Sequence, residues 1–103
     1  MACQEVLPAE ALVKLQSGEV VLLDVRTPAE WQGVRVPGSL HIPMDELTMR
    51  YQELDPETET LVLCAHGIRS AACADWLSRN GFEKVSNVRH GISAWPGPVE
   101  HGE

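Results

Sequence analysis

Two short apolar runs dominate the hydrophobic pattern of this chain. They are VVLLDV at residues 20–25 and TLVLC at residues 60–64, and neither alternates between apolar and polar positions. Continuous runs of this length are typical of strands that are buried on both faces, as in a parallel sheet. Weaker strand patterns follow at KVSNV (84–88) and SLHI (39–42). The pattern therefore predicts four strands, of which the two apolar runs are buried on both faces.

Helical patterns separate the predicted strands. Residues 8–18 begin with proline and end at Gly18, and glycine commonly ends a helix. In TPAEW, Thr27 stands at the N-cap, Pro28 at the first helical position and Glu30 three residues after the cap. This arrangement is a capping box, which satisfies backbone N–H groups at the start of a helix. We therefore expect one helix in 8–18 and another that starts at Pro28.

Two further segments have helical spacing. MDELTMRYQEL (44–54) places apolar residues on one face, namely Leu47, Tyr51 and Leu54. Beyond residue 70 an apolar face consists of Ala72, Cys73, Trp76 and Leu77, and the NG pair at 80–81 provides a left-handed stop. Strands that alternate with helices predict an α/β fold with right-handed crossovers. Ligands of such folds bind beyond the carboxyl ends of the strands, and Cys64 stands at one of these ends.

Length and composition fit one globular domain, which we expect to span residues 1–103. The formal net charge is −7, and the eight Lys and Arg residues are scattered. Nucleic acids and anionic membranes attract basic patches, so neither is an expected partner. The first residues lack the basic and apolar regions of a signal peptide, and the three cysteines include no C-x-x-C pair. We therefore expect a soluble, cytoplasmic protein, and a monomer.

The segment CAHGIRS, residues 64–70, joins a predicted strand to a predicted helix. Gly67 permits the tight curl that this short connection needs, so successive amides would point toward the sulfur of Cys64. We expect Ser70 to cap the following helix, whose N-terminus adds partial positive charge, while Arg69 adds a full one. These effects would hold the pKa of Cys64 below that of a free thiol, with His66 as a further proton acceptor. The alternative is a small, unreactive residue at the end of a buried strand.

The same segment resembles the active-site loop of the rhodanese family, which has the form C-x-x-G-x-R-S. Upstream, LLDVRTPAEWQGVRVPGSLHIP is similar to that family's D-V-R…E-[FW]…G-H-I-P-G-A-x-N-I-P segment. Downstream, GFEKVSNVRHGISAWPGPVE is similar to its G-[FY]-x-x-V…G-G-x-x-A-W…P-V ending. The three segments follow in the family's order from about Val20 to Val99. The differences are Val34, Arg35 and Val36 around the usual G-H-I, His41 at the usual Asn, and His90 at the first of two glycines.

The resemblance implies a central, mainly parallel sheet of about five strands flanked by helices. It also implies a sulfurtransferase that moves sulfane sulfur through a persulfide on Cys64. A small anionic donor such as thiosulfate would supply the sulfur, and a thiol, cyanide or a protein would accept it. The implied substrate-binding residues are Ala65, His66, Gly67, Ile68, Arg69 and Ser70, whose amides would stabilise the persulfide anion, with Arg69 also attracting the donor. No metal or organic cofactor is implied.

Several other residues have competing interpretations. Asp24 ends a buried strand, and it either supports the Cys64 loop, as the resemblance suggests, or is a solvated strand end. Arg26 either pairs with Glu30, which we favour, or extends toward the pocket mouth. His66 is either a proton shuttle or a solvent-facing residue. We expect Cys73 in the core and Cys3 exposed, although Cys3 could accept sulfur. Trp31, Trp76 and Trp95 are expected to pack in the core or in a lid, and the cysteine and histidine positions have no recognised metal-ligand spacing.

Two other functions compete with sulfur transfer. Phosphatases and arsenate reductases also use a cysteine in a cradle of amides, but their loop has five residues between Cys and Arg. Only four residues separate Cys64 from Arg69 here. The smaller ring of amides fits a single sulfur atom better than a tetrahedral oxyanion, which argues against phosphoryl chemistry. A protein-binding or sulfur-carrier adaptor with a rhodanese-like fold remains the second alternative.

Overall fold

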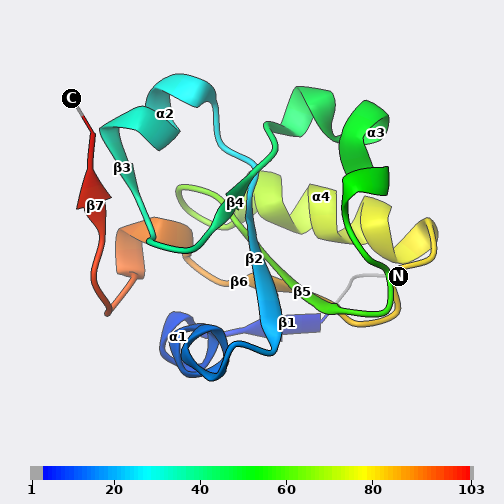
Figure 1. Ribbon diagram of the computed structural model, residues 1–103, viewed down its shortest axis with the longest axis horizontal. Coiled ribbons are helices and arrows are strands. Elements are labelled where there is room, and N and C mark those ends of the chain that lie inside the picture. The colour runs from blue at the N-terminus through cyan, green and yellow to red at the C-terminus, as the bar shows by residue number, and fades with distance from the viewer. Residues whose placement is uncertain (1–3, 103) are drawn as a thin grey trace.

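The computed structural model describes residues 4–102 and has a five-stranded parallel sheet at its centre (Figure 1). The strand order is β1-β6-β5-β2-β4. The strands are β1 (Gln4–Val6), β2 (Val20–Asp24), β4 (Leu40–His41), β5 (Glu59–Leu63) and β6 (Val85–Val88). The expected α/β architecture with about five mainly parallel strands is therefore confirmed. The four predicted strands are β2, β4, β5 and β6, each within one or two residues of its expected ends.

Three strands were not expected from the apolar pattern. The edge strand β1 has two exposed residues in QEV and offers only Val6 to the core. The strands β3 (Val34–Arg35) and β7 (Glu100–His101) form a separate antiparallel pair at the side of the molecule. Such short, half-exposed strands have too few apolar positions to produce a pattern. The pair holds the C-terminal segment of the described chain beside the segment that follows α2 (Figure 1).

Helices cover both faces of the sheet. They are α1 (Pro8–Ser17), α2 (Pro28–Gly33), α3 (Leu47–Arg50) and α4 (Ile68–Arg79), with the 3-10 turns η1 (Met44–Glu46), η2 (Tyr51–Glu53) and η3 (Gly91–Ala94). The predicted helix in 44–54 is therefore broken into η1, α3 and η2. Alternate strand residues enter two cores, because side chains of a strand point to opposite faces. Leu23 and Val62 pack with α3 and α4, whereas Leu22 and Leu61 pack with α1.

The expected helix ends are mostly present. Gly18 has φ 80° and follows α1 as its stop. The capping box of α2 is complete, because Thr27 Oγ1 accepts from the Glu30 N–H at 3.2 Å and Glu30 Oε1 accepts from the Thr27 N–H at 2.9 Å. Helix α4 departs from expectation on its buried face: Ala72 is exposed, and Ala74 takes the core position beside Cys73.

Candidate active site

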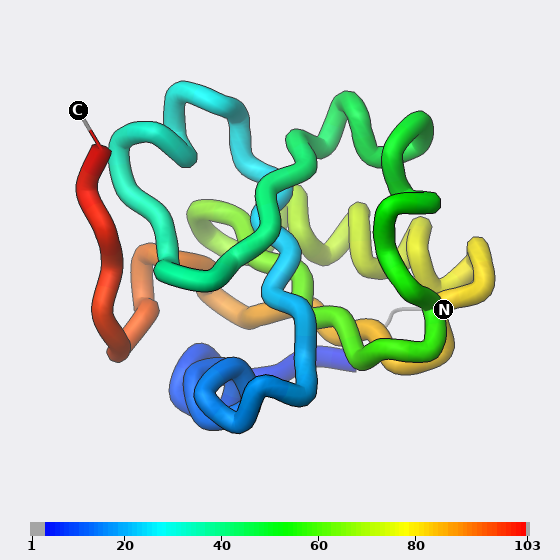
Figure 2. The backbone as a smooth tube through the Cα atoms, in the orientation of Figure 1, coloured from blue at the N-terminus to red at the C-terminus, as the bar shows by residue number. Residues whose placement is uncertain are grey.

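Cys64 is the first residue after β5, and the chain turns back there into α4. The smooth trace in Figure 2 follows this turn between the green strand and the yellow-green helix. Gly67 precedes the helix with φ 94°, a left-handed conformation that other residues rarely adopt. Helix α4 begins at Ile68, so the expectation that Ser70 caps it is wrong. Ser70 is instead the third helical residue, and it is completely buried beside the cysteine.

The turn after β6 supports this loop from behind. The N–H of Ile92 donates to the Cys64 carbonyl at 2.9 Å, and the N–H of Ser93 donates to the Ala65 carbonyl at 3.1 Å. A Cβ atom on Gly91 would overlap the backbone of Cys64 and Ala65. One on Gly67 would lie 2.9 Å from the backbone nitrogen of the same turn. The close approach of the two segments therefore requires glycine on both sides.

His90 stands in this turn where the rhodanese pattern has its first glycine. Its φ is 65°, the one positive value among the non-glycine residues that the structure describes. The residue thus keeps the left-handed backbone that a glycine would adopt easily. The substitution changes the side chain at the rim of the loop, where His90 is exposed, and leaves the course of the chain intact.

Three donors or acceptors surround the Cys64 sulfur. The N–H groups of Gly67 and Ser70 lie 3.1 Å and 3.3 Å from Sγ, and the Ser70 hydroxyl lies 3.2 Å from it. Cys64 itself is only 1% exposed. Burial raises the pKa of the Cys64 thiol, but hydrogen bonds from Ser70 and from the backbone of His66 and Gly67 outweigh it, so the pKa lies below its usual 9.0. The arrangement favours a thiolate at the end of β5.

Arg69 does not stand free beside the sulfur as expected. Its guanidinium forms two hydrogen bonds with the Glu30 carboxylate, at 2.8 Å and 2.9 Å. The bonds from Arg69, helped by the Thr27 N–H and hydroxyl and opposed by partial burial, lower the pKa of Glu30 from 4.5 to about 2. The positive charge of Arg69 is therefore largely balanced, and its clearest role is to tie the start of α4 to α2.

Arg26 has a different partner from the one expected. Its Nε and Nη2 atoms bind the carboxylate of Asp24 at 2.8–3.0 Å, and both residues are buried. Toward Glu30 it reaches only the backbone carbonyl, at 3.4 Å, and it also binds the Val34 carbonyl at 2.6 Å. Within residues 4–102, the Asp24 carboxylate makes no hydrogen bond to the Cys64 loop. Asp24 is therefore connected to the loop only indirectly. It binds Arg26, which binds the backbone of Glu30 in α2, and the Glu30 carboxylate binds Arg69.

The expected loop residues differ in their exposure. His66 and Ile68 are exposed, and Ile68 is 79% exposed at the start of α4. Ala65, Gly67 and Arg69 are half-buried. The exposed position of His66 favours the solvent-facing interpretation of that residue.

Asn87 is a site residue that the sequence analysis missed. It lies on β6, is 2% exposed, and accepts a hydrogen bond of 2.5 Å from the Ser70 hydroxyl. Its Nδ2 group donates to the Gly67 carbonyl and to Glu5 Oε2, each at 3.2 Å. The signal in the sequence was the polar pair SN within KVSNV, since a polar residue in a buried strand needs a partner.

Cys73 lies in the core, as expected. It is 3% exposed, and burial, with a smaller contribution from the charge of Cys64, raises the pKa of its thiol to about 11. Cys3 falls outside the described residues. Within residues 4–102, no group of three or more His, Cys, Asp or Glu residues is placed to hold a metal ion.

Two of the three tryptophans, Trp76 and Trp95, pack against the cores, whereas Trp31 packs on a side chain outside them. Trp31 stacks on His41 with ring centroids 4.9 Å apart, and His41 Nε2 lies 2.8 Å from the Arg26 carbonyl. Trp76 meets Tyr51 edge to face beside the core of α3 and α4. Trp95 packs against the core on the side of α1. His41, at the position of the family's Asn, therefore helps to fix the Arg26 segment.

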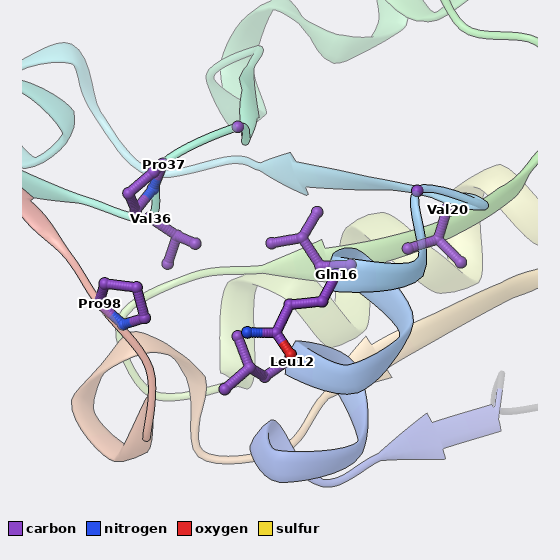
Figure 3. A pocket seen from close by; sticks show the side chains of 9 residues that line it. Leu12, Gln16, Val20, Val36, Pro37 and Pro98 are labelled. Atoms are coloured by element: carbon purple, nitrogen blue, oxygen red, sulfur yellow. The ribbon is translucent and has the colours of Figure 1, made fainter.

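Two surface pockets have different relations to the cysteine. One of about 450 Å³ borders the site at Arg69 and is otherwise lined by Val25, Thr27, Pro28, Pro43, Met44 and Asp45. Figure 3 shows another, of about 430 Å³, between α1 and the segments around Pro37 and Pro98. No residue of the loop 64–70 lines the second pocket.

No helix in the described chain combines the length and apolar character needed to cross a membrane.

Known proteins resemble this chain over most of its length. The model of the rhodanese-like domain matches residues 7–97. A thiosulfate sulfurtransferase, GlpE, from Tolumonas auensis is 35% identical over 86 residues, which cover 84% of this chain and 81% of that protein. A Bacillus subtilis protein with the name "Putative sulfur carrier protein YrkF" is 38% identical over 88 residues. Its match covers 84% of this chain and 48% of YrkF, so this chain spans about half of that relative's length.

A solved structure has the same fold. The rhodanese-related protein from Thermoplasma volcanium superposes with a TM-score of 0.87 at 31% identity, over 95% of this chain and 98% of that one. The fold, the family model and the relatives agree with the three ordered motifs of the sequence. This chain belongs to the rhodanese-like domain family.

Proposed function

We propose that this chain is a sulfurtransferase that carries sulfane sulfur as a persulfide on Cys64. Its family and the names of its relatives support a role in sulfur transfer. The observation that carries the assignment to Cys64 is the geometry around Sγ: two backbone amides and one hydroxyl lie within 3.3 Å of this buried sulfur. Hydrogen bonds of this kind increase the share of the nucleophilic thiolate without an adjacent base.

The first half-reaction loads the sulfur. The Cys64 thiolate attacks the outer sulfur of thiosulfate and forms a new S–S bond. The S–S bond of the donor breaks, and sulfite leaves with the electron pair. The product persulfide has one negative charge on its outer sulfur. The first-turn N–H groups of α4, on Ile68 and Arg69, have no intrahelical acceptors and can bind this charge.

The second half-reaction empties the site. Cyanide or a thiol attacks the outer sulfur, and Cys64 leaves as the thiolate that the Gly67 and Ser70 amides stabilise. With cyanide the product is thiocyanate, and the free thiolate is ready for another cycle. Besides the donor and the acceptor, the two steps use only groups of the chain itself.

The charge near the site bears on the donor. Because Glu30 balances Arg69, the attraction of an anionic donor rests mainly on the loop amides and the N-terminus of α4. Thiosulfate is thus the simplest donor to test, and thiols, cyanide or a protein are the acceptors that we propose. A sulfur carrier that serves a partner protein is the second candidate, favoured by the likeness to YrkF.

The proposal is tested by sulfur transfer from thiosulfate to cyanide. Cys64→Ser removes the nucleophile, so thiocyanate formation should fall to background. Cys73→Ala alters the other described cysteine and should retain much of the wild-type rate, because Cys73 is buried and protonated. Hydrolysis of an aryl phosphate, measured on the same preparations, should be negligible. Full transfer by Cys64→Ser, or phosphatase turnover faster than sulfur transfer, would refute the proposal.

A further inference from the structure

The side-chain amide of Asn87 is held in one orientation. Its Nδ2 group donates to the Gly67 carbonyl and to the Glu5 carboxylate, and both of these groups can only accept. The carbonyl oxygen Oδ1 must then face the Ser70 hydroxyl, 2.5 Å away. Turning the amide over would set Oδ1 against two other acceptors. Asn87 therefore always presents an acceptor to Ser70.

The Ser70 hydroxyl has one proton and two groups that compete for it. One is Oδ1 of Asn87, and the other is Sγ of Cys64 at 3.2 Å. While Cys64 is a thiol, its S–H can donate to Ser70 Oγ and the hydroxyl can donate to Asn87, so every group has a partner. When the sulfur is an anion, it can only accept, so beyond the Gly67 and Ser70 amides it competes with Asn87 for the hydrogen bond of the same hydroxyl. Donation to the sulfur then leaves two oxygen atoms 2.5 Å apart with no proton between them.

We propose that Asn87 is a positioning residue for the reacting sulfur: it accepts the hydrogen bond of the Ser70 hydroxyl whenever Sγ is uncharged, and it makes redirecting that hydrogen bond to the thiolate costly. The inference rests on the proposed function, because it concerns the sulfur that would carry the persulfide. In the persulfide the charge lies on the outer sulfur, and Sγ is again uncharged. Asn87 thus stabilises the thiol and the loaded state relative to the empty thiolate.

Other titratable and charged groups belong to the loop itself or to the elements around it. They are His66 from the loop, Arg69 and Cys73 from α4, Glu30 from α2, Asp24 and Arg26 from the end of β2, Glu5 from β1, and His90 from the turn after β6. None of them binds the Ser70 hydroxyl among the described hydrogen bonds. Substitution of Asn87 or Ser70 leaves all of these groups in the sequence. Comparing each substitution with the two together therefore measures the coupling between Asn87 and the Ser70 hydroxyl.

The test is a titration of the Cys64 thiolate by its ultraviolet absorbance. Each variant is compared with the same variant carrying Cys64→Ser, so that the other cysteines cancel and no sulfur donor is needed. Asn87→Leu has a similar size but no acceptor, and it should lower the Cys64 midpoint by about one pH unit, the scale of one hydrogen bond to a charged group. In the Ser70→Ala background the same change should have little effect.

Asn87→Asp provides the matched comparison. Leu and Asp both lose the bonds to the Gly67 carbonyl and to Glu5, but Asp presents a stronger acceptor to Ser70. It should raise the midpoint, and by more with Ser70 present than in Ser70→Ala. This variant decides the question if Asn87→Leu fails to fold.

Two results would overturn the inference. One is a midpoint raised by Asn87→Leu, and the other is an equal shift, by either variant, with and without Ser70. In both cases Asn87 would act only by holding the Gly67 carbonyl. Because the titration uses no donor, it stands apart from the sulfur-transfer assay: loss of transfer with the predicted shifts would refute the proposed function alone.

Discussion

The ion pair between Glu30 and Arg69 should make the stability of this protein fall in acid. Glu30→Gln removes the charge but keeps an oxygen at Oε1, so the capping box with Thr27 remains possible. The change therefore separates the ion pair from the helix cap. It also leaves Arg69 partly exposed to water, where its charge can be hydrated.

The size of the effect follows from the pKa of Glu30. A pKa lowered from 4.5 to about 2 would correspond to about 3 kcal/mol if the charges were shielded from water. The two side chains are 34% and 35% exposed, so solvent screening reduces the contribution to about 1 kcal/mol. Because the pKa of the folded protein is the lower one, this stability is complete above pH 4.5 and is lost as the pH falls toward 2.

Urea unfolding at a series of pH values measures this contribution. At pH 7, Glu30→Gln should lose about 1 kcal/mol of unfolding free energy, and the difference from wild type should shrink between pH 4.5 and pH 2. Glu100→Gln is the control. Glu100 is 55% exposed, and its 3.4 Å pair with Arg35 is longer than the 2.8 Å pair of Glu30, so this substitution should cost little stability. If Glu30→Gln equals wild type at neutral pH, or if their difference does not change in acid, the reasoning is refuted.

Two further predictions concern the loop and the second cysteine. Gly91→Ala should cost about 3 kcal/mol of stability in thermal unfolding, because the backbone there is left-handed and the new Cβ atom would overlap Cys64 and Ala65. Gly38→Ala is the control: its backbone is also left-handed but its Cβ atom would lie in open space, so it should cost about 1 kcal/mol. Equal costs would contradict the close approach. Iodoacetamide at pH 8 should leave Cys73 unlabelled until urea unfolds the chain, because the pKa of its thiol is about 11. Peptide mass spectrometry reads the label, and rapid labelling of Cys73 in the folded protein would contradict its burial and raised pKa.

The sequence predicted those parts of the fold that depend on local patterns. Continuous apolar runs located β2 and β5, because strands buried on both faces need apolar residues throughout. The capping box located the start of α2 through contacts within three residues. The edge strand β1 escaped, because two of its three residues are exposed and its pairing with β6 joins distant parts of the chain.

The position of Cys64 at the end of β5 and the course of its loop into α4 were also predictable, but the partners of the charged residues were not. Glu30 was explained as a cap, yet its carboxylate also binds Arg69, which lies 39 residues away. Asn87 reaches Ser70 only because β6 lies next to β5 in the sheet. Such contacts depend on the register and crossover of the folded chain, and no spacing in the sequence encodes them.

The most direct test of the account is the mass of Cys64 after exposure to thiosulfate. The protein is treated with the donor, freed of small molecules and digested without reductant, and the peptide that contains Cys64 is weighed. We predict one added sulfur atom on this peptide, lost again on treatment with cyanide, and none on the peptide of Cys73. An unmodified Cys64 peptide, or added sulfur that resides elsewhere and survives in Cys64→Ser, would contradict the central claim.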